Sequence, residues 1–254
     1  MAGLSANDIA AVLRDRILRE NSPYPRGSDF PSQRALAAEF GVSDSTINRA
    51  LQGLRRQGLL SLGQGRKTKV THMPQITRDA RDRYNEAKRV EDRGGFAAEV
   101  RRQGMTPRSE TSVRREVPPA RIAEFLGIDQ DAQVLVRDRD MYADDTLVQK
   151  APSYIPGEIA FGTRLEDLTQ PTGGMLTTMK DLGHEEVYAD EYLTLSRPPT
   201  GGEQEFFDIQ DDQPVFELYH VAIDVNGRAV EVSWHRGPVH LWGEFVYRVQ
   251  IKRS

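Results

Sequence analysis

Residues 32–58 read SQRALAAEFGVSDSTINRALQGLRRQG, and this stretch decides the fold of the N-terminal part of the chain. Two short helical patterns follow one another in it, each preceded by a serine of the kind that caps helices. Ser32 begins the first pattern and Gly41 ends it, while Ser43 begins the second and Gly58 ends it. Two helices joined by so tight a Gly-Val-Ser turn have the spacing of a helix-turn-helix.

A helix precedes this motif and a hairpin follows it. Residues 5–20 place apolar side chains at helical spacing, and the proline-rich residues 21–31 cannot continue that helix. Residues 59–71, LLSLGQGRKTKVT, predict two short strands around a Gly-Gln-Gly-Arg-Lys turn. A basic, glycine-rich hairpin after the second helix is typical of a wing that lies along DNA phosphates.

The 254-residue chain has a net charge of −4, which argues weakly against nucleic-acid binding, but the charge is unevenly distributed. Residues 1–74 carry 11 basic and 6 acidic residues, a net charge of +5, and the remainder carries −9. A basic end on an acidic body suits a protein that docks one end on a polyanion. Chance unevenness between two domains is the alternative explanation.

Recognition helices enter the major groove of DNA by their N-terminal residues, and this rule defines a predicted DNA-contacting surface. The start of the preceding helix is expected to reach the flanking backbone, and the wing to reach phosphates. The predicted residues are Gln33, Arg34, Ser43, Asp44, Ser45, Thr46, Asn48, Arg49, Arg66, Lys67 and Lys69.

Residues 30–70, FPSQRALAAEFGVSDSTINRALQGLRRQGLLSLGQGRKTKV, resemble the winged helix-turn-helix of the GntR regulators. The Pro-Ser-x-Arg-x-Leu-Ala start and the Val-Ser-x-x-Thr turn carry the resemblance. It implies a homodimer that reads a short palindrome in double-stranded operator DNA.

Two residues depart from the pattern of that family. Asp44 stands where an arginine is usual, and Asn48 stands where an arginine is frequent. A carboxylate near phosphates is unfavourable unless it pairs with a neighbouring arginine or accepts a hydrogen bond from a cytosine amino group, which makes Asp44 a candidate specificity residue. The other interpretation is that Asp44 merely supports the first turn of the helix. Both interpretations of Asp44 stay open, and the operator sequence cannot be taken over from relatives.

The rest of the chain predicts a charged linker over residues 75–95 and a second domain over residues 96–254. Within that domain, patterns of alternation predict strands over 111–117, 133–142, 147–155, 187–196, 215–225, 229–236 and 244–251. Helices are expected at 120–126, 175–182 and about 203–207. The Asn226-Gly227 pair marks a hairpin. Strands in succession with few helices predict an antiparallel sheet covered by helices, so the whole chain is expected to be an α+β protein of two domains.

This half of the chain also resembles a known domain. The segments FAAEVRRQGMTPRSE, VLVRDRDMYADD, SYIP and AVEVSWHRGPVHLWGEFVY are similar to the UTRA effector domain of HutC-type GntR regulators. The resemblance implies a chorismate-lyase-like fold and a small-molecule sensor whose strand residues line a pocket beneath the sheet. Ala97 stands where relatives that bind sugar phosphates place a serine or threonine, so an amino-sugar phosphate is not predicted.

Alternation along the strands selects Arg137 with Arg139, and Glu231 with Ser233 and His235, as candidate effector-binding residues, and the resemblance to the UTRA domain adds Tyr154, Tyr188 and Glu191. Arg137 and Arg139 project from one face and repel unless they share an anion, which either a ligand or a protein carboxylate supplies. The candidates are Arg137, Arg139, Tyr154, Tyr188, Glu191, Glu231, Ser233 and His235. The alternative is internal: Arg139 pairs with Glu231 or Glu191, and the other arginine is solvated.

Several classes of function are disfavoured by what the sequence lacks. It has no cysteine, and its five histidines lack the spacing of metal ligands. No phosphate-binding loop, nucleophile elbow or dinucleotide fingerprint occurs, so no catalytic residue, metal or cofactor is predicted. Neither a signal peptide nor an apolar run of membrane-spanning length is found, which favours the cytoplasm and no membrane partner.

Three functions remain open at this stage. The leading one is a dimeric repressor that a small molecule, anionic if the two arginines bind it, releases from its operator. An enzyme is the first alternative, because the second domain resembles a lyase fold. A regulator whose second domain only dimerises is the other.

Overall fold

The computed structural model of the chain describes residues 4–61, 67–84, 95–168 and 175–249. The chain divides into two compact units, Met1–Gln75 and Ile76–Ser254. Each unit has a hydrophobic core of its own, so the two are described separately.

The first unit is a winged helix-turn-helix, as the sequence predicts. It contains α1 (Ala6–Leu18), α2 (Gln33–Phe40) and α3 (Asp44–Arg56), and a serine side chain accepts a backbone N–H at the start of each. The wing follows as β1 (Leu60–Ser61) paired antiparallel with β2 (Lys69–Val70). Leucine and isoleucine side chains from all three helices form the buried core.

The second unit is built on a seven-stranded sheet within the described residues. Its strands are β4 (Pro107–Glu116), β5 (Val134–Ala143), β6 (Thr146–Lys150), β7 (Ser153–Pro156), β8 (Glu186–Arg197), β9 (Val215–Asp224) and β10 (Ala229–Pro238). They lie in the order β4-β5-β6-β10-β9-β8, and β7 pairs with β5 and β10. All these pairs are antiparallel, which confirms the predicted α+β organisation.

One predicted strand is divided in two. Residues 147–155 form the end of β6 and most of β7, with Ala151 and Pro152 between them. A proline lacks the N–H that a ladder needs, so the chain leaves one pairing there and enters another.

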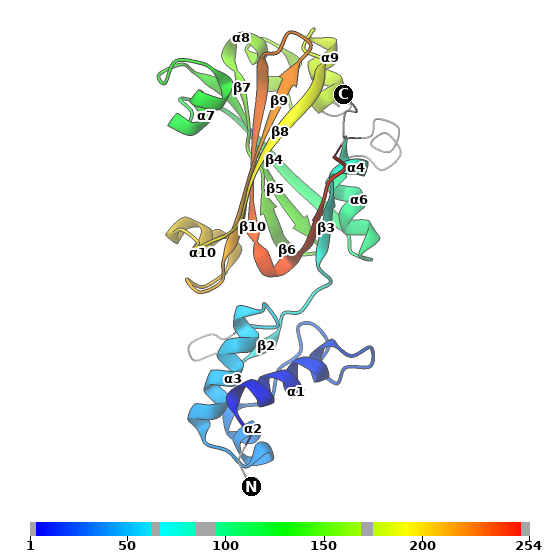
Figure 1. Cartoon of the computed structure of the whole chain (residues 1–254), viewed down its shortest axis with the longest axis vertical. Helices are drawn as coiled ribbons and strands as arrows, with labels where there is room; N and C mark the ends of the chain where they lie inside the picture. The colour runs from blue at the N-terminus through cyan, green and yellow to red at the C-terminus, as the bar shows by residue number, and fades with distance from the viewer. Residues whose placement is uncertain (1–3, 62–66, 85–94, 169–174, 250–254) are drawn as a thin grey trace. The chain divides into compact units, whose positions relative to one another are not determined.

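Helices cover both faces of the sheet. On one face α7 (Ala120–Leu126) packs on a cluster of buried apolar side chains from β5, β7, β9 and β10. At one end of the other face lie α8 (Gly157–Ala160), the 3-10 helix η1 (Arg164–Glu166) and α9 (Met175–Asp181). A further helix, α10 (Gly201–Phe207), packs near β9 and β6. Figure 1 shows α7 on the opposite side of the sheet from α4 (Ala80–Arg83) and α6 (Gly95–Arg102).

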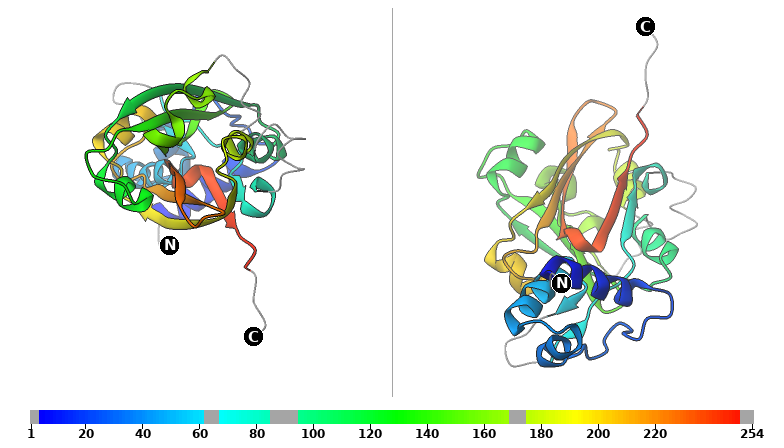
Figure 2. Two further views of the ribbon diagram at one scale, coloured as in Figure 1. Left: turned by 90° about the horizontal axis from the view of Figure 1, so that it is seen from above. Right: turned by 60° about the horizontal axis from the view of Figure 1, so that its bottom comes forward.

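The predicted linker over residues 75–95 is wrong for residues 76–84. Ile76–Asp79 forms β3, which pairs in parallel with β11 (Trp242–Val246), and the two strands lie side by side in Figures 1 and 2. The helix α4 follows directly. Ile76 is fully buried and Arg78 nearly so, which shows that this segment belongs to the second unit. Residues 85–94 lie outside the described part of the chain.

Gly237 on β10 provides a test of the packing between β10 and its neighbours. A Cβ atom there would lie 2.5 Å from the carbonyl oxygen of Val148 and 2.7 Å from the ring of Phe216. We expect Gly237→Ala to lower the free energy of unfolding of the second unit by about 1–3 kcal/mol, because backbone and ring must both shift. Denaturant unfolding followed by tryptophan fluorescence measures this, since Trp234 and Trp242 both lie in the second unit.

The control is Gly202→Ala, at the start of α10, where a Cβ meets no atom within 4 Å. This substitution should leave the free energy of unfolding unchanged or raise it slightly, because alanine favours the helical conformation. Equal effects of the two substitutions would contradict the close packing around Gly237.

Candidate functional site

The first candidate surface is the solvent-facing side of α3. Ile47, Ala50, Leu51 and Leu54 point into the core of the first unit. Between them, the exposed positions are Asp44, Ser45, Asn48 and Arg49, which share the other face of the helix at its N-terminal half. The structure therefore brings these predicted residues onto one continuous, solvent-accessible strip.

Two other predicted residues hold this strip in place. The side-chain amide of Gln33 donates to the carbonyl oxygen of Asp44 (2.8 Å), which ties the start of α2 to the start of α3. The hydroxyl of Ser43 accepts the N–H of Thr46 and lies 2.9 Å from the hydroxyl of Ser45. Gln33 and Ser43 thus support the turn of the motif, while Arg34 is exposed beside it.

The wing presents its lysines to solvent. Lys67 and Lys69 are both exposed, and the ammonium group of Lys67 forms an ion pair with Asp29 (2.6 Å). An ion pair this exposed contributes little and exchanges readily for a phosphate. Arg66 lies outside the described residues.

The second candidate site is a polar row that crosses one face of the sheet. Residues directly opposite one another in an antiparallel ladder share a face. Following the ladder from β5 through β7, β10 and β9 to β8 gives the row Arg137, Ser153, Ser233, His220 and Glu191. Four of its five residues are buried, and Glu191 at the edge is mostly so.

Arg139, two residues along from Arg137, extends this row on the same face. Its guanidinium donates to the carbonyl oxygen of Ala151 (3.1 Å) and to the hydroxyl of Ser153 (2.8 Å). It also approaches the hydroxyl of Ser233 (3.3 Å), which in turn donates to Glu231 (2.9 Å). Arg139 is thus linked to Glu231 through a serine and not by a direct ion pair. Burial lowers the pKa of Arg139, and Glu231 opposes that shift.

Arg137 is only 8% exposed, and it donates to the carbonyl oxygen of Leu165 in η1 (2.5 Å). The alternative in which one of the two arginines is solvated is therefore wrong. Since a carbonyl oxygen carries no net charge, Arg137 remains a buried cation.

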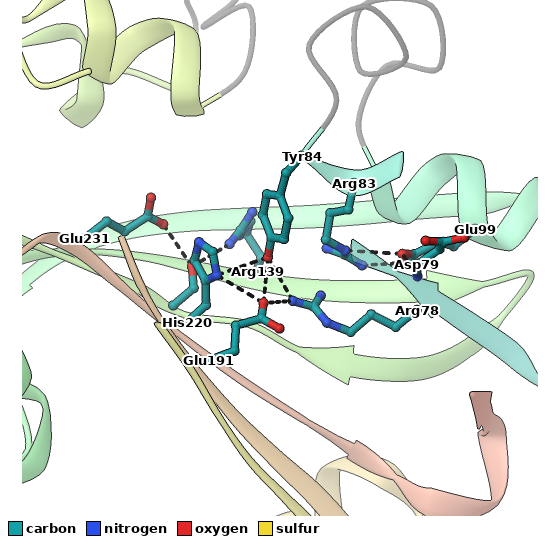
Figure 3. A network of polar contacts seen from close by, with 10 residues as sticks. Arg78, Asp79, Arg83, Tyr84, Glu99, Arg139, Glu191, His220 and Glu231 are labelled. Atoms are coloured by element: carbon teal, nitrogen blue, oxygen red, sulfur yellow. Dashed lines mark hydrogen bonds and ion pairs between the residues drawn. The ribbon is translucent and has the colours of Figure 1, made fainter. Parts of the chain in front are cut away.

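At the β8 end, side chains from β3 and from the residue after α4 join the row (Figure 3). The guanidinium of Arg78 donates to Glu191 (2.5 Å) and to the hydroxyl of Tyr84 (2.9 Å). Tyr84 donates to the same Glu191 oxygen (2.7 Å), and Nδ1 of His220 lies 3.1 Å from it. The rings of Tyr84 and His220 are stacked with 5.0 Å between their centres.

A second buried ion pair lies beside these residues. Arg83 at the end of α4 pairs with Glu99 of α6 (2.5 Å), which also accepts the backbone N–H of Asp79 (3.0 Å). Figure 3 shows Arg83 and Arg78 side by side above the sheet, each directed at its own carboxylate. The β3–α4–α6 segment therefore brings two arginines to the polar row.

These contacts set the protonation of the cluster. Burial acts to raise the pKa of Glu191, but the hydrogen bond from His220 and the positive charge of Arg78 hold that pKa far below its usual range. Burial, with the positive charges of Arg78 and Arg83, holds the pKa of His235 well below its usual value. At neutral pH, Glu191 is therefore charged and His235 is neutral.

A cavity of 760 Å³ opens at the β8 end of the row. Its walls come from β8, from α4 and the residue after it, from His220 of β9 and from residues 247–249, and they include Tyr84, Glu191 and Tyr247. This volume suits a small metabolite. The site thus consists of a buried, charged interior and a cavity that reaches its edge.

Two family models match the chain. The UTRA domain matches residues 102–240, more than half of the chain, and "Bacterial regulatory proteins, gntR family" matches residues 5–70. The chain belongs to the UTRA-domain regulators of the gntR family. It is therefore a DNA-binding transcription regulator with an effector-binding domain.

Individual relatives agree with this family. The chain is 27% identical over 241 residues to "Uncharacterized HTH-type transcriptional regulator SCO4628" of Streptomyces coelicolor, covering 91% of this chain and 89% of the relative. It is 22% identical over 215 residues to "HTH-type transcriptional regulator GgaR" of Escherichia coli K12, covering 82% and 77%. PhnF from Mycobacterium smegmatis shares the fold, with a TM-score of 0.57 at 19% identity over 95% of this chain and 99% of that one.

The UTRA domain brings together most of the predicted effector residues. Arg137, Arg139, Glu231, Ser233 and His235 all lie on one sheet face, as alternation predicts. Glu191 joins them from the neighbouring edge strand. Arg78, Tyr84 and His220 were not predicted from the sequence. The only signal for His220 was an ionisable side chain on an apolar strand, and Arg78 and Tyr84 lie in a segment rich in charges.

Two predicted residues do not fit this arrangement. Tyr154 pairs with Val136 and Val232 and packs with α7 on the opposite face of the sheet. Tyr188 lies on the face of β8 opposite to that of Glu191, and it is 57% exposed at the rim of the cavity. Tyr154 therefore lies away from the polar row, whereas Tyr188 lines the cavity together with Glu191 although it is on the other face of β8.

The described residues contain no cluster of three or more His, Cys, Asp or Glu arranged to hold a metal ion. Among the helices described, none is both long and apolar enough to cross a bilayer.

His235 predicts a pH dependence of stability. The unfolded chain takes up a proton on this histidine near pH 6.5, whereas the folded chain resists it, so acid favours unfolding. The free energy of unfolding should fall by about 1.4 kcal/mol for each pH unit below about 6.5 on account of His235 alone. Denaturant unfolding of the second unit at pH 7.5 and at pH 5.5 measures this.

His235→Gln should remove this contribution, leaving the slope smaller by about one proton per molecule. His240, whose burial lowers its pKa to about 4, continues to contribute in the variant. A slope unchanged by the substitution would contradict the buried, neutral state of His235.

Proposed function

We propose that this regulator is a homodimeric repressor that a small anionic effector, held on the polar row of the UTRA domain, releases from its operator. One observation carries the proposal: Arg137 and Arg139 are buried or half-buried on one sheet face, and Arg78 joins the end of the same polar row by pairing with Glu191 in the wall of a cavity of metabolite size. A protein that only needed a stable sheet would place apolar side chains there, because burying charge is costly.

For operator recognition, we propose that the strip on α3 contacts bases and that the wing contacts phosphates. Arg49 is exposed on the N-terminal half of α3 and is suited to a bidentate contact with guanine. Lys67 and Lys69 add a contribution that is independent of sequence and sensitive to salt. A DNA-binding regulator acts where the chromosome is, so we place it in the cytoplasm.

Asp44 remains a candidate specificity residue. Its side chain is exposed at the first position of α3, and no described residue is recorded as pairing with its carboxylate. The two interpretations make different predictions, because a cytosine contact depends on operator sequence and support of the helix does not.

Support for a homodimer comes from β8. This strand is at the edge of the sheet and is 12 residues long. Val187, Tyr188, Tyr192 and Leu195 on it are each 46–63% exposed. Long edge strands with exposed apolar side chains invite pairing with another strand, and a second copy of this chain supplies one.

The alternatives are weaker. An enzyme would need a nucleophile or base aimed into the cavity, whereas Glu191, His220 and Tyr84 there are engaged with one another and with Arg78. A domain that only dimerises would have no use for the buried row away from the β8 edge.

Arg49→Ala tests the recognition surface. With an operator selected from a random oligonucleotide pool, we expect a loss of about 10- to 100-fold in affinity, as for a lost base contact. Arg56→Ala is the control, because it removes the same charge from the exposed C-terminal end of the same helix. Fluorescence anisotropy at fixed salt measures the affinity of both variants for the operator. Equal losses of affinity would contradict a base contact by Arg49 and would indicate a general effect of charge.

Arg139→Gln tests the effector site. A screen of metabolites should find compounds that raise the melting temperature of the wild type and release the operator, and the variant should bind them at least about tenfold more weakly. Arg114→Gln is the control, since Arg114 lies on the neighbouring β4 and pairs with Asp138 and Glu116. If no compound stabilises the wild type, the result would favour the alternative in which the second domain only dimerises.

A further inference from the structure

The ion pair between Arg78 and Glu191 leaves several polar atoms without partners. Arg78 is 1% exposed, and its Nη2 atom donates to Glu191 and to Tyr84, while the hydroxyl of Tyr247 in the cavity wall also interacts with Arg78 and Glu191. The Nε and Nη1 atoms of Arg78 are buried with no partner, and so is the Oε2 atom of Glu191. Guanidinium and carboxylate groups typically meet through two parallel hydrogen bonds, which is not the case here. Arg78 therefore has capacity for a further acceptor, and Glu191 for a further donor.

The surrounding charges are also unbalanced. Among the described residues of this cluster, the cations are Arg78, Arg83, Arg137 and Arg139, and the carboxylates are Glu99, Glu191 and Glu231. Asp79 is compensated by its own ion pair with Arg81. The arginines and carboxylates by themselves leave one positive charge in excess. A buried excess charge calls for a counter-charge, and a ligand with a single negative charge would supply it.

The cavity leads to this ion pair. Glu191 and Tyr84 line the cavity wall, and Arg78 donates to both of them from the side of β3. Glu191 sits on β8, and Ala189, on the same face of that strand, lines the cavity with it, so the side chain of Glu191 can turn into the cavity. A ligand in the cavity therefore meets Glu191 first and reaches Arg78 by displacing it.

We propose that the effector is a small hydroxycarboxylate whose carboxylate takes the place of Glu191 on Arg78, while its hydroxyl donates to the released Glu191. This inference rests on the effector function proposed above. A planar carboxylate matches the fork of the guanidinium group and uses the nitrogen atoms that lack partners. A neutral hydroxyl donor keeps the charge balanced, whereas an amine would restore the positive excess.

The proposal also connects the effector to the first unit along the chain. Strand β3 begins at Ile76, the residue that follows the first unit. Displacing Glu191 replaces a bond between β3 and β8 with a bond between β3 and the effector. The segment that leads to the DNA-binding unit thus has different partners in the free and bound states, which differential binding requires.

The test uses the full chain and three probes at constant ionic strength. Sodium lactate is the hydroxycarboxylate, lactamide is its neutral counterpart, and inorganic phosphate is the other anion. We expect lactate to raise the melting temperature in a dose-dependent way, and lactamide and phosphate to have no effect. Stabilisation by phosphate instead of lactate would overturn the carboxylate class.

Glu191→Gln is the decisive variant, because glutamine keeps the size of the side chain but no longer competes as an anion. It should bind lactate about tenfold more tightly than the wild type, since no ion pair has to be broken. Arg78→Gln should lose the response. Arg197→Gln removes another half-buried arginine, paired with Glu203, and should keep the wild-type response.

Equal lactate affinities of wild type and Glu191→Gln would overturn the displacement, even if Arg78→Gln fails to fold. A response that survives in Arg78→Gln but is lost in Arg139→Gln would also overturn the proposal, while leaving the effector function of the polar row intact. No response to lactate in any variant, with hits in the metabolite screen, would overturn the hydroxycarboxylate class alone.

Discussion

Burying charged side chains in the middle of a sheet face is the constraint on which the second unit depends. A guanidinium or carboxylate taken out of water must find partners, and no single strand supplies them all. Arg139 finds serines on β7 and β10, Arg137 a carbonyl oxygen of η1, and Arg78 a carboxylate on β8. Register, strand order and the covering segment must therefore all be correct for the charges to be buried.

The parts of the fold with local signals were predictable. Serine caps, Gly41 and the Asn226-Gly227 turn specify the first unit and the β9–β10 hairpin over a few residues each. Strand β3 was not predictable, because its four residues include Arg78 and Asp79, which resemble solvated charges in a segment rich in them. Only the tertiary pairing with β11 and the carboxylate of Glu191 makes them interior.

The site was predictable to the extent that alternation along one strand determines it. The two-residue spacing places Arg137 with Arg139, and Glu231 with Ser233 and His235. Which strands lie side by side, and in which register, is not written in any local pattern. The pairing of His220 with both Ser233 and Glu191 therefore escaped prediction, and so did the position of Tyr154 on the face opposite the polar row.

The same constraint explains why β3 is suited to respond to a ligand. A two-stranded sheet such as β3–β11 is marginal by itself, so β3 also depends on contacts outside that sheet, among them the Arg78–Glu191 ion pair and the hydrogen bond from Asp79 to Glu99. An interaction that is incompletely bonded, at the wall of a cavity and on a short strand, is easier to exchange than one inside a large core. Because β3 directly follows the DNA-binding unit in the chain, it is the shortest covalent connection between the effector site and that unit. A change in the contacts of β3 therefore acts on the segment that joins the two.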